Sequence, residues 1–321
     1  MLFNIFKSNQ RITGVGVFML SILLWVPGYF KEASIVFNYK DPLLSAMGYL
    51  MGTGGVNVFF TSVLIGGQAI FLNYLINDHK LFKSTHFVVA FFYVLLNGAC
   101  YDLFSFNPVV FANTFILLGL HQLFRLYNLT SSLSVIFNAG LFFGIGALLY
   151  PPLVLVFPLV WVSLSYLRSP KANDYLVAII GFIVPFVYWG VYLFLTDNLA
   201  DFNEDVIFQH HIINSPFIAG SNLYFFACLG VVFLLALFSG IGFLNRSIVK
   251  IRKLFVLLLL FLILCLPTVL FNYYDFAALY LLLIPGASVV IANFMVTLKK
   301  GWQAELLVLL LVAAMILHYF L

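Results

Sequence analysis

Residues Arg246–Phe271 read RSIVKIRKLFVLLLLFLILCLPTVLF. Four basic residues occur within the first eight positions, and the 18 residues from Leu254 to Phe271 carry no charge. An α-helix of about 20 apolar residues crosses the ~30 Å hydrocarbon core of a bilayer, because each residue adds ~1.5 Å. This stretch therefore predicts a membrane-spanning helix with a basic flank on one side.

The same pattern of an apolar run between short polar turns recurs along the chain. We expect an all-α fold, namely a polytopic membrane helix bundle of about 11 transmembrane helices in one integral-membrane domain, residues 1–321. The predicted spans are Ile12–Phe30, Val56–Ile76, Thr85–Cys100, Pro108–Phe124, Ser131–Leu149, Leu153–Leu167, Tyr175–Leu195, Leu223–Leu244, Leu254–Phe271, Ala277–Leu298 and Leu306–Leu321.

The lysine and arginine residues are distributed unequally between the turns on the two sides of the predicted membrane spans. If the N-terminus is cytoplasmic, 13 of the 15 lysines and arginines fall inside, and only Lys31 and Lys40 fall outside. Short cytoplasmic loops carry an excess of Lys and Arg, so the partition predicts an N-in, C-out topology. The two long outer loops are then residues 31–55 and 196–221.

Composition excludes several classes of protein. The chain is 64% hydrophobic and 8% charged, whereas about a quarter of the residues of a soluble domain are charged. The net charge of +4 comes from short cytoplasmic turns, where topology accounts for it. We therefore expect a lipid bilayer as the partner and no nucleic acid.

The first outer loop predicts a short interfacial helix. Asp41 and Pro42 resemble an N-cap and first helical residue, and apolar residues then follow at helical spacing up to Met51. The glycines of Gly52–Gly55 would end it. Such an amphipathic helix over Pro42–Met51 would lie in the outer membrane interface.

Acidic residues gather on the predicted outer side. Asp41 and Asp102 are the candidate catalytic carboxylates, and Asp102 follows a span in a very short loop where free solvation is harder. The alternative for each acid is a solvated loop end, and for Asp41 also a simple helix cap. Lys31 and Lys40 could meet a lipid phosphate, or they could merely snorkel from the end of the first span.

The second outer loop holds a candidate metal or ligand site. On a helix, Asp201, Glu204 and Asp205 would share one face, and their oxygens suit a divalent cation such as Mg²⁺ or Mn²⁺. His210 and His211 are candidate ligand-binding residues beside them, although adjacent histidines cannot both point to one helix face. Solvated loop residues are the alternative for the whole set.

Within the predicted spans, ionisable residues are nearly absent, which argues against a proton or ion pathway. The buried amides, Gln68 and Asn113 among them, fit hydrogen bonding between helices, and His86 and His121 fit packed bundle residues. Tyr150-Pro151-Pro152 predicts a tight turn between two short helices, whereas Pro158 and Pro185 are expected within spans.

From about Leu95 to Leu199, the sequence resembles a family of uncharacterised bacterial polytopic inner-membrane proteins. The resemblance covers about a third of the chain and implies topology and an inner-membrane location rather than an activity. It is carried by Asn107-Pro108 through Asn113-Thr114, Phe124-Arg125-Leu126-Tyr127, Phe137-Asn138-Ala139-Gly140, Tyr150-Pro151-Pro152, and Ile180-Gly181-Phe182 with Pro185.

More distantly, the layout resembles the GT-C class of membrane glycosyltransferases, which use polyprenyl-phosphate-linked sugars. The shared features are a long first outer loop, Gly181 with Pro185 after a basic turn, and a late proline span, Tyr273–Pro285. The resemblance implies Asp41 as the catalytic or metal-holding acid and Asp102 as the second acid. The chain departs from the class in having no acidic pair in its first loop, and Asp275 where many members have an arginine.

Three hypotheses follow. The first is a GT-C-like glycosyltransferase on the outer face of a bacterial inner membrane, with a polyprenyl-phosphate-linked donor. The second is a non-enzymatic subunit or scaffold of an envelope assembly, with other membrane-protein subunits as partners. The third is a lipid or small-solute transporter.

Overall fold

The computed structural model describes residues 6, 11–30, 54–99, 107–127, 133–197, 220–271, 276–298 and 300–320. Every regular element within these ranges is a helix, which confirms the all-α expectation for this part of the chain. The elements are α2 (Arg11–Leu24), α3 (Val26–Phe30), α5 (Gly55–Asp78), α6 (Val88–Gly98), α7 (Pro108–Arg125), α8 (Leu133–Leu149), η2 (Pro151–Val156), α9 (Pro158–Leu167), α10 (Ala172–Leu195), α12 (Gly220–Arg246), α13 (Val249–Cys265), α14 (Thr268–Phe271), α15 (Phe276–Thr297) and α16 (Gly301–Phe320).

Prolines and one cap set several helix starts. Asn107 accepts a hydrogen bond from the backbone N–H of Val109 at 2.9 Å, and Pro108 opens α7. Pro151 and Pro152 begin the 3₁₀ segment η2 after Tyr150, as expected for a tight turn. Pro158 lies within the apolar helical segment Pro151–Leu167, inside the predicted span Leu153–Leu167, at the point where η2 is followed by α9. It is the first residue of α9, where its missing N–H is not needed for a helical hydrogen bond.

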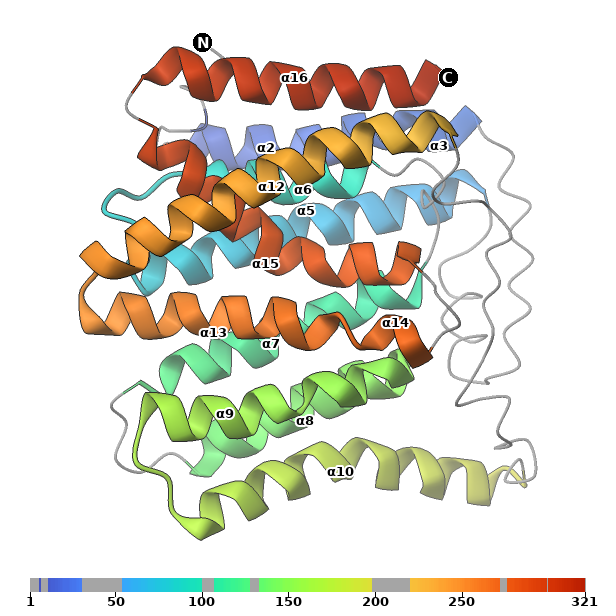
Figure 1. Cartoon of the computed structure of the whole chain (residues 1–321). Coiled ribbons are helices and arrows are strands. Elements are labelled where there is room, and N and C mark those ends of the chain that lie inside the picture. The colour runs from blue at the N-terminus through green and yellow to red at the C-terminus, as the bar shows by residue number, and fades with distance from the viewer. Residues whose placement is uncertain are drawn as a thin grey trace.

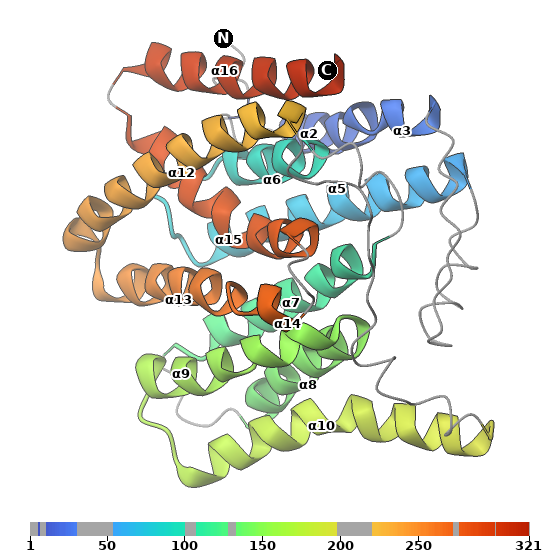
Figure 2. The same ribbon diagram turned by 45° about the vertical axis from the view of Figure 1, so that its right-hand side comes forward.

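The helices run back and forth between two ends of one bundle (Figure 1). α10 lies along one edge and α16 along the other, and α15 crosses the middle in both ribbon views (Figures 1 and 2). α8 packs between α7 and α10, while α15 contacts α6, α7, α12 and α13. α15 thus packs against helices from both the first part of the chain (α6 and α7) and the last part (α12 and α13).

α6 is the most enclosed helix of the bundle. All 11 of its residues are buried, against neighbours that include α2, α5 and α15. At ~1.5 Å per residue it is about 16 Å long, shorter than a hydrocarbon core. Within the predicted span Thr85–Cys100, α6 is therefore a protein-enclosed helix that needs no lipid-facing surface.

Helices α8 and α10 approach each other through glycines. A Cβ atom on Gly140 would lie 2.3 Å from the carbonyl oxygen of Ala178, and one on Gly144 would lie 2.4 Å from that of Phe182. Gly181 on α10 is equally close to Phe137. The Gly-x-x-x-Gly spacing of α8 therefore allows backbone-to-backbone packing, which is a common way for membrane helices to associate.

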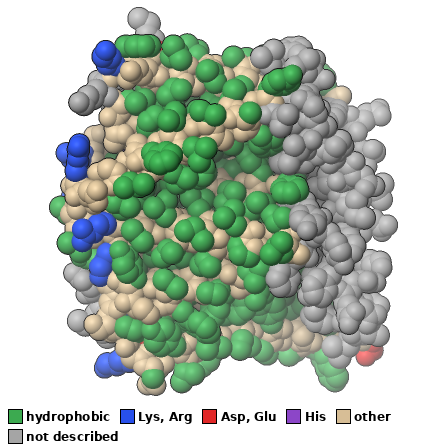
Figure 3. All heavy atoms as spheres, in the orientation of Figure 1, with side chains coloured by type: hydrophobic (Ala, Val, Ile, Leu, Met, Phe, Trp, Pro, Cys, Tyr) green, Lys and Arg blue, Asp and Glu red, His purple; other side chains and the backbone are tan. Residues whose placement is uncertain are grey.

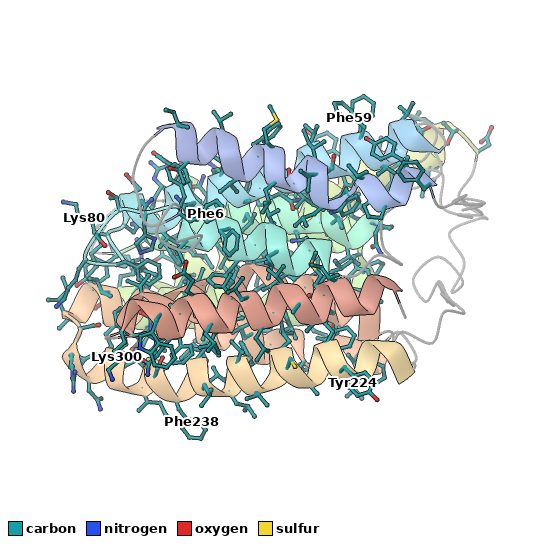
Figure 4. The ribbon with its side chains drawn as sticks, turned by 90° about the horizontal axis from the view of Figure 1, so that it is seen from above. Phe6, Phe59, Lys80, Tyr224, Phe238 and Lys300 are labelled. Atoms are coloured by element: carbon teal, nitrogen blue, oxygen red, sulfur yellow. The ribbon has the colours of Figure 1, made fainter. Side chains whose placement is uncertain are left out.

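The outer surface of the bundle is apolar over its middle. α10 exposes Leu176, Ile180, Ile183, Val187 and Val191, which follow one another at helical spacing. Figure 3 shows hydrophobic side chains covering the middle of one face, and Figure 4 shows Phe238 of α12 pointing away from the bundle. A continuous apolar surface of this kind needs an apolar solvent, which a bilayer supplies.

Among the described residues, six helices have the length and apolar composition to cross a membrane: Ile12–Phe30, Gly55–Asp78, Ala172–Leu195, Tyr224–Arg246, Val249–Leu270 and Phe276–Thr297. Other predicted spans form shorter apolar helices: Val88–Gly98, Leu133–Leu149, Pro151–Leu167 and Gly301–Ile316. The coarser expectation, a multi-pass membrane protein, agrees with these lengths.

Candidate functional site

One end of the bundle carries the positive charge, and we call it the basic end. Lys80 follows α5, Arg125 ends α7, Arg168 follows α9, and the other basic side chains sit at matching helix ends. Lysines and arginines form a column along one edge of the molecule in Figure 3, and Lys80 and Lys300 lie at the same end in Figure 4. The described members are Lys80, Lys83, Arg125, Arg168, Lys171, Arg246, Lys250, Arg252, Lys253 and Lys300.

The residues predicted to form the catalytic, ligand and metal sites belong to segments that join helices at the opposite end. Residues 31–53 connect α3 with α5, residues 100–106 connect α6 with α7, and residues 198–219 connect α10 with α12. Outside the described residues lie the helix predicted over Pro42–Met51 and the candidates Lys31, Lys40, Asp41, Asp102, Asp201, Glu204, Asp205, His210 and His211.

The helices that flank the first two of these segments form one packed group. α5 contacts α2, α3, α6 and α7, and α2 also contacts α6. The chain therefore leaves Phe30, returns at Gly54, and later leaves Ala99 and returns at Asn107 within the same group of neighbouring helices. The segments that contain Asp41 and Asp102 therefore attach to helices of one packed group, although about 60 residues separate the two acids.

Between the two ends, several buried polar side chains bond to one another or to backbone. Gln68 on α5 donates to the carbonyl of Val110 and the hydroxyl of Thr114 on α7, both at 2.7 Å, and accepts from the hydroxyl of Tyr93 on α6, also at 2.7 Å. Asn113 donates to the carbonyl of Leu281 at 2.9 Å. The expected interhelical role of Gln68 and Asn113 is confirmed, and both act as structural ties.

The basic end contains a histidine cluster that the sequence did not single out. It comprises His79, the residue that caps the C-terminus of α5, and His121 on α7, with 6.4 Å between the ring centroids. Phe124 lies edge-on to His79 with centroids 5.4 Å apart, and Phe71 lies edge-on to His121 at 5.8 Å. A clue was present in the sequence, because His121 and Arg125 have the four-residue spacing of one helix face.

The turn after α5 positions His79. The backbone N–H of Lys80 bonds to the carbonyl of Asn77 at 3.1 Å, and that of Leu81 bonds to Ile76 at 3.0 Å. This is the pattern of a Schellman motif, and it places Lys80 in the left-handed region, with φ of 53°. The reversal buries both Leu81 and His79, each on the protein side of the turn.

Burial and nearby positive charge both lower the pKa of His79. Burial, followed by the positive charge of Lys250, lowers the pKa of His79 to about 4, while the carboxylate of Asp78 opposes this change. Arg125 and His121 also lower it. His79 is therefore neutral at physiological pH, with ring nitrogens that can each donate or accept one hydrogen bond.

A second charged feature at the basic end joins α9 to α10. The guanidinium of Arg168 pairs with the carboxylate of Asp174, and their side chains are 9% and 4% exposed. Asp174 also accepts the backbone N–H of Lys171 at 2.8 Å, in the first turn of α10. The pair closes the turn between the two helices, which is a structural rather than a chemical role.

Within the described ranges, no three histidine, cysteine, aspartate or glutamate side chains converge in a way that could hold a metal ion. The His79–His121 pair thus stands without a third ligand of that kind in this part of the chain. The positive charges of Arg125 and Lys250 both lower the pKa of His79, and the carboxylate of Asp78 opposes them.

Comparison with known proteins places the chain in a family. No curated protein and no solved structure matched it. One family model, described as a family of unknown function (DUF6427), matches residues 1–321. The chain belongs to this family of unknown function.

Proposed function

We propose that the protein is a bacterial inner-membrane glycosyltransferase that acts on the outer face of the membrane, with eleven passes and an N-in, C-out topology. The basic end is then cytoplasmic, following the positive-inside rule. The opposite end, where the acid-bearing segments attach, faces outward. The observation that carries the proposal is the packing of α2, α3, α5, α6 and α7 into one group, because the segments of Asp41 and Asp102 both attach to it.

The proposed reaction transfers a sugar from a polyprenyl-phosphate donor to an acceptor hydroxyl. Asp41 takes the proton of the hydroxyl as its oxygen forms a bond to the anomeric carbon. The bond between that carbon and the donor phosphate breaks, and the phosphate leaves with the electron pair. Lys31 and Lys40 stabilise the phosphate charge, and a divalent cation on Asp201, Glu204 and Asp205 could assist the same step.

The sidedness is tested by reporter fusions. We expect fusions at Lys80, Lys171 and Lys253 to report the cytoplasm, and a fusion at Asp205 to report the outside. A cytoplasmic signal at Asp205 would overturn the topology and, with it, the outer-face reaction.

The reaction is tested in a strain whose phenotype depends on this chain. A general base contributes on the order of 10²–10⁴-fold in rate, so Asp41→Asn should abolish complementation while the protein still accumulates in the membrane. Glu32→Gln, at the end of the first span, is the matched control and should complement normally. Full complementation by Asp41→Asn would remove the proposed base and favour the non-enzymatic subunit or scaffold.

A further inference from the structure

The histidine cluster of the basic end has an unused hydrogen-bonding group at its centre. His79 is 8% exposed, and among the described residues its Nε2 atom has no hydrogen-bond partner. Oδ2 of Asp78 lies 3.9 Å from this nitrogen, beyond hydrogen-bonding distance. A buried polar nitrogen without a partner is costly, by roughly 1–3 kcal/mol, so such an atom is a candidate for contact with a ligand.

Helices α7 and α13 contribute the other side chains of the candidate site. His121 of α7 has a buried Nδ1 atom that also lacks a hydrogen-bond partner within the described ranges. Arg125 lies one turn further along α7, and Lys250 lies in the first turn of α13. The rings of His79 and His121 lie with centroids 6.4 Å apart, and the charges of Arg125 on α7 and Lys250 on α13 both act on His79 electrostatically.

Positive charge dominates this cluster. Arg125 and Lys250 contribute two positive charges, against the single carboxylate of Asp78; Arg125 and Asp78 are both exposed to water, which screens their charges. The guanidinium of Arg125 can bind two oxygens at once, and the ammonium of Lys250 acts as a point charge. Imidazole N–H groups supply further donors. A tetrahedral oxyanion matches this set of donors better than a carboxylate or a cation does.

We propose that His79, His121, Arg125 and Lys250 form a binding site for a phosphate group at the basic end of the bundle. A lipid headgroup and free phosphate share this chemistry. The aromatic rings of Phe71 and Phe124 beside the two imidazoles provide apolar surface next to the charges. Basic sites between helices at the cytoplasmic surface are a known way to hold anionic lipid headgroups. The inference is independent of the proposed reaction, which concerns the opposite end.

The test uses the full-length protein in two arms. In the first, the protein is placed in nanodiscs of phosphatidylcholine, with or without phosphatidylglycerol, and its thermal stability is measured. In the second, inorganic phosphate is titrated into the protein in detergent, with chloride at equal ionic strength as the reference. We expect stabilisation by phosphatidylglycerol, by phosphate, or by both, and the responding arm identifies the source.

The variants separate a site from general electrostatics. Arg125→Gln/Lys250→Gln removes two charges from the cluster, and Lys83→Gln/Lys300→Gln removes two exposed charges elsewhere at the basic end. Binding should weaken about tenfold or more in the first pair and much less in the second, because charge-assisted hydrogen bonds are lost only in the first. His79→Phe keeps an aromatic ring against Phe124 but removes both nitrogens, and should also weaken binding.

Two results would overturn the proposal. One is the absence of stabilisation in both arms with wild-type protein. The other is an equal loss of binding in the two charge-matched pairs, which would mean that the whole basic end attracts anions without a defined site. Either result leaves the outer-face reaction untouched, because Asp41→Asn tests that reaction separately.

Discussion

The side-chain amide of Asn113 on α7 donates a hydrogen bond to the backbone carbonyl of Leu281 on α15, with an N···O distance of 2.9 Å. Leu281 precedes Pro285 by four residues, and proline has no N–H with which to bond that carbonyl. In a membrane, an unsatisfied carbonyl costs several kcal/mol. Asn113 therefore compensates for a proline that lies 172 residues further along the chain.

Replacing this amide should destabilise the bundle. We expect Asn113→Leu to lower the free energy of unfolding by about 1–2 kcal/mol, the size of an interhelical hydrogen bond in model membrane helices. Thermal unfolding of the full-length protein in one detergent would measure the change. Pro285→Ala restores the N–H for Leu281, so Asn113→Leu should cost less in that background. Equal costs in the two backgrounds would mean that Asn113 stabilises the fold by another route.

The close approach of α8 and α10 makes a second prediction. Gly144→Ala places a methyl group 2.4 Å from the carbonyl oxygen of Phe182, so the helices must separate, at a cost of about 1–3 kcal/mol. Gly190 on α10 has nothing within 4 Å of its added Cβ, and Gly190→Ala should be neutral or slightly stabilising. The measurement is the melting temperature of each variant. Similar melting temperatures would contradict the close packing.

The low pKa of His79 predicts a pH dependence of stability. The folded-state pKa is about 4, below the usual value of about 6.5, so at intermediate pH the unfolded chain binds a proton that the folded chain does not. Stability should be greatest above pH ~6.5 and fall as the pH is lowered toward 4. His79→Gln should show a shallower fall over this range in melting experiments. Identical slopes for the two proteins would argue that His79 is accessible to water.

Because Arg168 and Asp174 form a buried ion pair, we expect removal of one charge to destabilise the fold more than removal of both. Asp174→Leu leaves the largely buried guanidinium of Arg168 without this carboxylate, and breaking a buried pair in this way costs about 3–5 kcal/mol. Arg168→Met/Asp174→Leu removes both charges and should recover part of that loss. Recovery should be incomplete, because Asp174 also accepts the N–H of Lys171. A double variant less stable than Asp174→Leu would contradict this account.

The sequence predicted features that depend on local residues better than features that depend on contacts between helices. Hydropathy predicted spans over Leu223–Leu244 and Leu254–Phe271, and the structure has α12 ending at Arg246 and α13 running over Val249–Cys265. The existence of both helices was predicted, although not their ends, because hydropathy and charge act on the helix that carries them. The length of α6 was overestimated. A helix enclosed by protein need not match the bilayer, and neighbours at α2, α5 and α15 are not visible in local hydropathy.

The candidate sites also differ in whether local sequence could predict them. The chemistry of Asp41 and Asp102 is a prediction from residue type and sidedness, and both residues lie outside the described ranges. The cluster of His79 and His121 was not predicted, because 42 residues separate the two histidines and each by itself resembles a packed bundle residue. Their proximity comes from the packing of α5 against α7.

The sequence by itself determined that the chain forms apolar helices with basic residues grouped at alternate turns. These properties depend on the solvation of each segment in water or lipid, which its own residues decide. Tertiary structure decided which helices touch. It brought Asn113 to the carbonyl that Pro285 leaves free, Gly140 to Ala178, and His79 to His121. Hydrogen bonds and close packing need atoms within a few ångströms of each other, and only the folded chain places distant residues that near.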